Sequence, residues 1–195
     1  MCIRDRATAA SAFAGGYKAS AALSGDVALG LNAATSGSST TGNVAIGSGA
    51  SAVSTNDGTS VAIGANATAS TGGAVSIGYN TQATNTNSTA LGWQAVATGA
   101  GSSALGNYSI ATALQATAIG NQSSATGQQS LAVGYLARAL NASGALALGY
   151  QPVASGTNSV VIGASVNDNG NNNTIVIVNN DSNKNLQDSL LNEGI

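Results

Sequence analysis

The chain has 195 residues, no histidine, one cysteine, 6% charged residues and a net charge of −2. Most enzyme chemistry near neutral pH uses His, Cys, Lys or paired carboxylates, so this composition argues against a catalyst and against a cofactor. Between Gly30 and Gly163 only Asp57 and Arg138 are charged, so there is no basic stripe for phosphate groups and nucleic acid is not an expected partner.

The first six residues differ from everything that follows them. Residues 1–6 contain the only Met, the only Cys and three charged residues of the chain. We interpret them as a leader that is foreign to the fold, and residues 7–24 as a degenerate first coil of the repeat described next. No apolar run approaches the roughly 18–20 residues that span a bilayer, so we expect no membrane-spanning segment.

Residues 25–178 are dominated by one short motif, in which a small residue is followed by Ile, Leu or Val and then by Gly. We name this last residue the motif glycine. Such a regular period is typical of a solenoid, because a single repeat cannot bury its apolar face and neighbouring coils must stack into one core. The sequence therefore predicts an all-β fold, a single-chain parallel β-roll of about ten 14-residue coils. The motif glycines are Gly30, Gly47, Gly64, Gly78, Gly92, Gly106, Gly120, Gly134, Gly149 and Gly163.

Each coil is predicted to hold two short strands and two tight turns. The first strand covers the three residues before the motif glycine, where bulky residues alternate with Ala or Ser. The second strand contains an Ala five residues after the motif glycine, with polar residues around it. Gly99, Gly127, Gly156 and Gly170 follow that Ala, and we expect them to form the second corner with positive φ.

Two packings of this pattern are possible. With the bulky residues inside, each chain would be a self-sufficient monomer. With the alanines inside, the bulky residues form an apolar row along the outside of the rod, and such a row requires a partner. Ordering the backbone of one coil costs about 14–28 kcal/mol, whereas burying one Val and one Ile contributes roughly 3–5 kcal/mol, so alanine contacts alone look insufficient.

We therefore favour the second packing, in which the rows of identical chains meet on a common axis. Three narrow rolls around one seam fit a cyclic homotrimer. The residues predicted to form this seam are Val44, Ile46, Val61, Ile63, Val75, Ile77, Leu91, Leu105, Ile119, Val133 and Leu148.

The period is interrupted in three places. The first two regular coils carry three extra residues each, within 36–42 and 54–59, and we expect bulged turns there. After Gly163 the pattern decays and then resumes in residues 175–178, which we interpret as a closing rung. Residues 179–195 are polar with leucines at helical spacing, as expected for the start of a neck or stalk.

Motifs such as Asn43–Gly47, Ser60–Gly64 and Ser88–Gly92 resemble the head repeat of trimeric autotransporter adhesins, the YadA-like head. The resemblance covers residues 25–178. It implies a left-handed β-roll that forms a homotrimer and is displayed outside the outer membrane of a bacterium. It also implies non-enzymatic attachment to a host cell surface, a matrix protein or a glycan. Similar repeats occur in viral tail fibres, so a shaft or receptor-binding segment of such a fibre is the alternative.

Four aromatic residues directly follow a motif glycine: Tyr79, Trp93, Tyr135 and Tyr150. In a stacked roll they would line one edge as two pairs, with about 4.8 Å between neighbours. They are either a strip that binds sugars or a protein, or corner packing between protomers, and the usual burial of large rings favours the second interpretation.

The stretch from Asp168 to Asn171 has the oxygen-rich character of a calcium loop. It contains one carboxylate and lacks the closing Glu of an EF-hand, so we expect an ordinary turn and no metal site.

Overall fold

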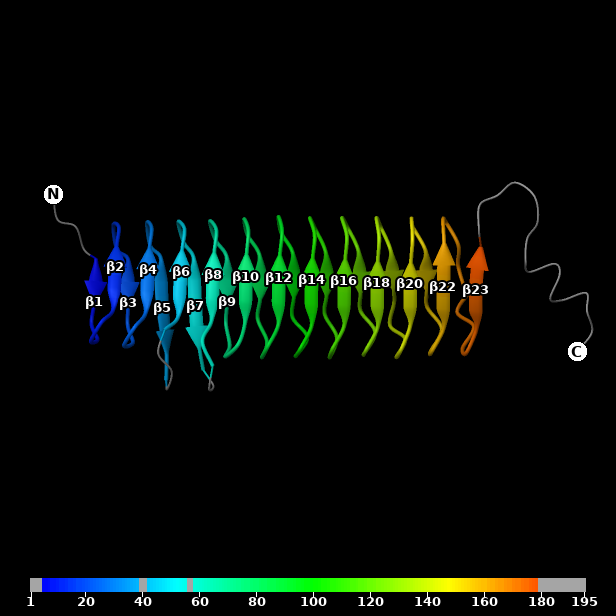
Figure 1. Cartoon of the computed structure of the whole chain (residues 1–195), viewed down its shortest axis with the longest axis horizontal. Coiled ribbons are helices and arrows are strands. Elements are labelled where there is room, and N and C mark those ends of the chain that lie inside the picture. Colours follow the sequence, from blue (N-terminus) through cyan, green and yellow to red (C-terminus); the bar gives the residue numbers. More distant parts are fainter. Residues whose placement is uncertain (1–4, 39–41, 56–57, 179–195) are drawn as a thin grey trace, which may run out of the picture.

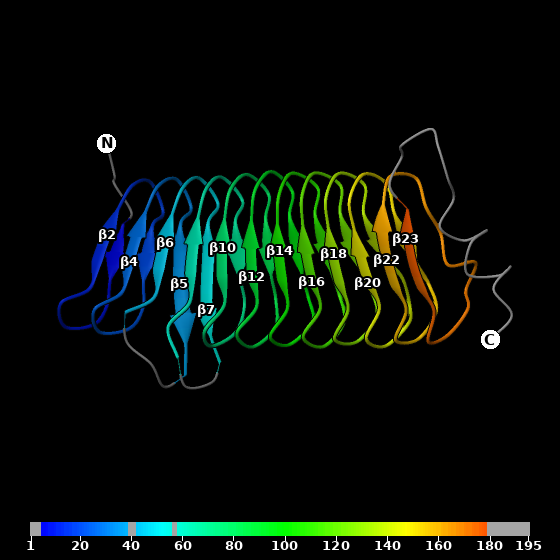
Figure 2. The ribbon, with the colours of Figure 1, turned by 45° about the vertical axis from the view of Figure 1, so that its right-hand side comes forward.

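The computed structural model describes residues 5–38, 42–55 and 58–178, which wind into a rod of stacked coils with its N-terminal and C-terminal coils at opposite ends (Figures 1 and 2). Each coil contributes one strand to each of two parallel sheets. These residues contain no helix, and so none long and apolar enough to cross a membrane.

The sheets alternate along the chain. The motif strands form a twelve-stranded sheet of β2 (Phe13–Gly15), β4 (Val27–Leu29), β6 (Val44–Ile46), β8 (Val61–Ile63), β10 (Val75–Ile77), β12 (Thr89–Leu91), β14 (Ser103–Leu105), β16 (Thr117–Ile119), β18 (Leu131–Val133), β20 (Leu146–Leu148), β22 (Val160–Gly163) and β23 (Ile175–Val178). The second strands form an eleven-stranded sheet of β1 (Arg6–Ala7), β3 (Ser20–Ala21), β5 (Ala34–Gly37), β7 (Ser51–Ser54), β9 (Thr68–Ala69), β11 (Gln82–Ala83), β13 (Val96–Ala97), β15 (Ile110–Ala111), β17 (Ser124–Ala125), β19 (Arg138–Ala139) and β21 (Val153–Ala154).

Neighbouring coils pair in register, with identical motif positions stacked on one another. In β8 and β10, for example, Val61 pairs with Val75 and Ile63 with Ile77. The predicted parallel β-roll is therefore confirmed. The motif sheet has two strands more than the ten motifs, because β2 comes from the degenerate first coil and β23 is the closing rung.

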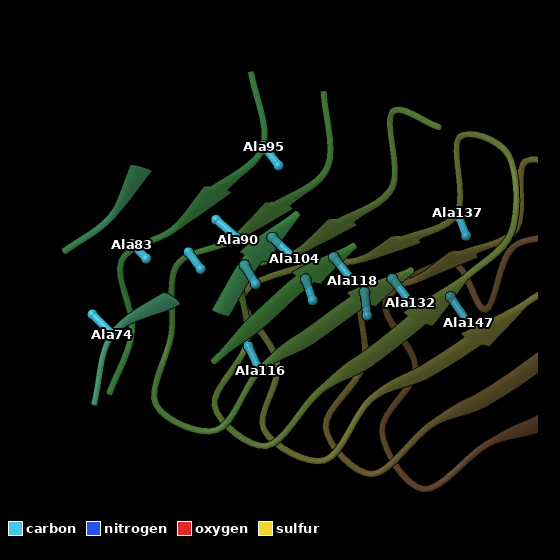
Figure 3. Close-up of a cluster of buried hydrophobic side chains, with 14 of the residues drawn as sticks. Ala74, Ala83, Ala90, Ala95, Ala104, Ala116, Ala118, Ala132, Ala137 and Ala147 are labelled. Carbon is cyan, nitrogen blue, oxygen red and sulfur yellow. The ribbon is translucent and has the colours of Figure 1, made fainter. Parts of the chain in front are cut away.

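Alanine fills the space between the two sheets. The central residue of most motif strands and the Ala of most second strands are fully buried, as Ala62 and Ala69 are in one coil. In Figure 3 these alanine side chains lie between the two layers of strands. The central position is Ala in most motif strands and Val161 and Val176 in β22 and β23, and the aliphatic residues on either side of it point outward. The alanine-inward packing is confirmed.

At one place along the rod, a polar pair replaces two of the inward alanines. Ser76 and Thr81 take the inward positions, where the Ser76 hydroxyl donates to Thr81 Oγ1 at 2.8 Å and the Thr81 hydroxyl donates to the carbonyl oxygen of Gly78 at 3.1 Å. Because both hydroxyls are paired, neither Ser76 nor Thr81 adds an unsatisfied polar atom to the interior.

The first corner of each coil follows the prediction, whereas at the second corner only Gly170, with φ of +78°, has the positive φ expected of it. Motif glycines such as Gly92, with φ of +134°, adopt a backbone conformation that favours glycine. At the second corner, the expectation of positive φ at Gly99, Gly127 and Gly156 is wrong. A Cβ on any of these three would collide with the backbone carbonyl of the next coil, at Ala113, Ala142 and Asn171 respectively. Glycine is needed there for close approach of the backbones.

The positive φ of the second corner lies two residues further on. Gly101, Gln115 and Gln129 hold it in consecutive coils. Side chains with an amide are tolerated there because the left-handed region is accessible to them at modest cost.

In the two coils with extra residues, the second strand is longer than in the other coils. β5 and β7 have four residues each, whereas most strands of their sheet have two. Residues 39–41 and 56–57 of the expected bulged turns lie outside the described residues, as do the tail 179–195 and residues 1–4 of the expected leader. Arg6, the last residue of that leader, belongs to β1 and pairs with Ser20.

Candidate binding surface

The outward residues of the motif sheet form a row along the rod, which we name the outer row. Each coil contributes the first and third residues of its motif strand. The third residue is aliphatic in every regular coil, whereas the first residue is Thr89, Ser103 or Thr117 in three of them. Along the row, the eleven residues predicted for the seam are all partly or largely exposed: Val44, Ile46, Val61, Ile63, Val75, Ile77, Leu91, Leu105, Ile119, Val133 and Leu148. Leu91 is 46% exposed, and Ile119 and Leu148 are 38% and 39% exposed.

The outer row runs the full length of the rod. It continues into Phe13 of β2 at one end and into Ile175 and Ile177 of β23 at the other, and all three are exposed. An exposed row of this length is typical of a surface that packs against a partner.

The outer face of the eleven-stranded sheet is different in kind. Its outward residues include Thr68, Gln82, Ser124 and Arg138, mixed with the apolar Val96, Ile110 and Val153, and Ile110 is 39% exposed. Because polar residues interrupt the apolar ones, this face has no aliphatic residue that repeats in every coil.

The four aromatic residues lie on one edge of the rod as two stacked pairs. The ring centroids of Tyr79 and Trp93 are 4.3 Å apart with planes inclined by 26°, and those of Tyr135 and Tyr150 are 5.4 Å apart at 18°. The spacing within each pair agrees with that expected from the period. We name the residues directly after the motif glycines the ridge.

Two apolar members of the ridge escaped the sequence analysis. Tyr17 follows Gly16, the motif glycine of the degenerate first coil, and Leu31 follows Gly30. Both are exposed. Counting 14 residues back from Gly30 would have identified Gly16, but its strand ends in Gly15, where other coils have Ile, Leu or Val.

Asp168 lies where other coils carry an inward Ala in the second strand, and it is buried. Its carboxylate accepts hydrogen bonds from the backbone N–H groups of Ser155 at 2.9 Å, Gly156 at 2.8 Å and Gly170 at 3.0 Å, and from the Ser155 hydroxyl at 2.9 Å. Burial opposes ionisation, but these hydrogen bonds outweigh it and hold the pKa of Asp168 well below its usual range.

The Asp168 carboxylate therefore caps the end of the eleven-stranded sheet. In earlier coils the corresponding N–H donates to a backbone carbonyl, as Leu140 does to Ala154 at 2.8 Å. Since its oxygens are already occupied by donors of the chain, Asp168 acts as a structural acceptor in a turn. In the described parts of the chain, no three His, Cys, Asp or Glu residues gather where they could hold a metal ion.

Together, the outer row and the alanine interior define a class of protein: a parallel β-solenoid of similar coils with a row of aliphatic residues along one outer face. A family model described as the YadA head domain repeat (2 copies) matches residues 59–81, 83–109, 111–137 and 141–165, more than half of the chain. The chain belongs to this family and is a YadA-like head domain of a trimeric autotransporter adhesin. Family membership makes it part of a surface-exposed passenger domain. No curated protein matches the chain.

Proposed function

We propose that this chain is the head of a trimeric fibre that attaches a bacterium to host cells, extracellular matrix or other surfaces. Three copies bury their outer rows against one another, and the mixed faces of the eleven-stranded sheets point outward. The single observation that carries the proposal is the outer row, which leaves aliphatic residues such as Leu91 exposed along the whole rod.

A monomer would expose this row to water in every coil. Burying one half-exposed aliphatic side chain contributes about 1 kcal/mol, and each coil offers up to two of them. Three chains with ten or more coils each therefore gain a large total from the seam, although part of it offsets the entropy lost on association.

Attachment by such a fibre is multivalent. Each rung repeats on three identical faces, so contacts that are individually weak add through avidity. The described surface between Gly58 and Val178 has Arg138 as its only exposed charge, which leaves little role for electrostatic steering. Recognition then depends on shape, hydrogen bonds and aromatic contact.

The test is attachment of the purified chain, coupled to beads, to cultured epithelial cells and to immobilised collagen, fibronectin and laminin. We expect saturable attachment to at least one of these surfaces. The Ile63→Asp variant should lose it together with assembly, because it places a carboxylate in the seam. The control variant Gln82→Asp adds the same charge on the opposite outer face and should still assemble. Failure of the assembled wild type to attach to any of these surfaces would contradict the adhesin function.

A further inference from the structure

The ridge carries an ordered pattern of side chains along the rod. Two aromatic pairs, Tyr79 with Trp93 and Tyr135 with Tyr150, are separated by two coils whose ridge residues are Asn107 and Asn121. The interval between Trp93 and Tyr135 thus has aromatic rings at both ends and the amides of Asn107 and Asn121 between them, with exposed Tyr108 next to Asn107.

The stacking fixes how the rings face. Neighbouring coils are about 4.8 Å apart along the rod, and the ring centroids within each pair are 4.3 and 5.4 Å apart with nearly parallel planes. The rings therefore lie across the rod axis, and in each pair one face of each ring is covered by its partner.

The other face of Trp93 and the other face of Tyr135 look toward each other along the ridge. They are three rungs apart, or about 14 Å. Among the described residues, neither ring stacks on any aromatic side chain outside its own pair. Trp93 and Tyr135 are 49% and 44% exposed, so both remain accessible to a ligand in the single chain.

The floor of the interval supplies hydrogen-bonding groups without charge. Asn107, Asn121 and the adjacent Gln122 are exposed, and their side-chain amides form no hydrogen bond within the described chain. Each amide offers two donors and an acceptor. The one exposed charge of the later coils, Arg138, lies in the eleven-stranded sheet and not on the ridge.

Amides on the ridge also argue against its burial between subunits. The outer row holds aliphatic residues, Ser and Thr, and none of its positions in the regular coils carries an amide. Burying Asn107 and Asn121 without partners would cost several kcal/mol, so the ridge fits the rim of an assembly better than its seam.

On the basis of the proposed adhesin function, we propose that the interval from Trp93 to Tyr135 binds a short neutral oligosaccharide. The apolar C–H faces of hexose rings pack on the two aromatic faces, and sugar hydroxyls exchange hydrogen bonds with the amides of Asn107, Asn121 and Gln122. The absence of cations on this interval favours neutral sugars over sialylated or sulfated ones.

Tryptophan fluorescence reports on this site directly, because Trp93 is the only tryptophan of the chain. The full chain is titrated with cellohexaose, chitohexaose and mannohexaose while Trp93 emission is recorded. We expect a saturable change with at least one of these sugars and none with a heparin hexasaccharide. Tyr135→Ala, and separately the double variant Asn107→Ala with Asn121→Ala, should weaken binding about tenfold. Tyr17→Ala, at the far end of the ridge, is the matched control and should bind as the wild type does.

The remaining outcomes overturn the proposal. They are no response to any of the three neutral sugars, equal binding by Tyr135→Ala, and loss of assembly in Tyr135→Ala, which would assign the rings to packing between subunits. An assembled chain that attaches to cells but binds none of the sugars would contradict only this sugar site. A chain that neither assembles nor attaches would contradict the proposed function itself.

Discussion

A Cβ atom on Gly92 would lie 2.5 Å from the carbonyl oxygen of Gly106, the motif glycine of the next coil. The φ of Gly92 is +134°, a conformation that side chains rarely adopt. The same relationship repeats between successive motif glycines. These glycines therefore set how closely the coils can stack.

Gly92→Ala should destabilise the fold by about 3 kcal/mol or more, because it combines backbone strain with a collision that only movement of a coil can relieve. Chemical denaturation at fixed chain concentration measures the loss. The matched control is Gly101→Asn. Asn87 holds the equivalent position one coil earlier, and a Cβ on Gly101 meets only the Gln115 side chain, at 3.6 Å. This control should lie within about 1 kcal/mol of wild type, and equal losses in both variants would contradict the stacking argument.

The interior should reject large side chains. Ala118 is fully buried between the sheets, whereas its neighbour Thr117 is only partly buried on the outer row. Ala118→Leu should lower the free energy of unfolding by about 3 kcal/mol, because the roll cannot widen in one coil alone. Thr117→Val, which enlarges the outer row instead, should be neutral or stabilising. Thermal unfolding measures both effects. An Ala118→Leu variant as stable as the wild type would show that the interior can accept a side chain larger than alanine.

The Asp168 cap should make the C-terminal coils sensitive to acid. Its pKa is lowered in the fold, so the stability it contributes is present above the ordinary carboxyl value of 3.8. That contribution is lost as the pH falls from this value toward the folded-state pKa. At neutral pH, Asp168→Ala should cost about 3 kcal/mol by leaving the N–H groups of Ser155, Gly156 and Gly170 without their acceptor.

Hydrogen exchange at the amides of Ser155 and Gly156 locates this loss. In the wild type their protection should fall between about pH 4 and pH 2, and in Asp168→Ala it should be low at all pH values. Asp5→Ala, in an exposed residue far from the cap, should leave the profile unchanged. Equal protection in wild type and Asp168→Ala would show that the carboxylate does not hold the coil end.

Much of this fold could be predicted because one period governs it. The alternation of Ala62 with Val61 and Ile63 sufficed to place alanine inside and aliphatic residues outside, since a 14-residue coil leaves no room for the reverse. The first coil was harder to recognise because Gly15 replaces its aliphatic residue. Residues 175–178 kept the period in their apolar run, and the prediction of a closing rung was right.

The local sequence did not reveal whether a given glycine is needed for a positive φ or for close approach of two backbones. Gly99 and Gly101 look alike in sequence, yet the first is needed for close approach to Ala113 and the second holds a positive φ. Both requirements arise from the neighbouring coil, which the sequence of one coil does not contain. The Asp168 cap was missed for a related reason, because all of its donors except the Gly170 N–H come from the coil before it.

The seam should tolerate no charge. Ile77→Asp, in the middle of the outer row, should dissociate the assembly while leaving the β-roll of each chain intact, because the substituted side chain points away from the alanine interior. Sedimentation together with circular dichroism separates these two effects. Gln82→Asp serves as control on the opposite face. If the Ile77→Asp variant stays assembled, the outer row is not the interface between the chains.

The molecular mass of the wild-type chain in solution tests the account most directly. We propose that three chains meet along the outer row, so light scattering at micromolar concentration should give three times the chain mass of 18.7 kDa. A stable, folded monomer at that concentration would contradict it, because the aliphatic row would then remain exposed along the entire rod without cost.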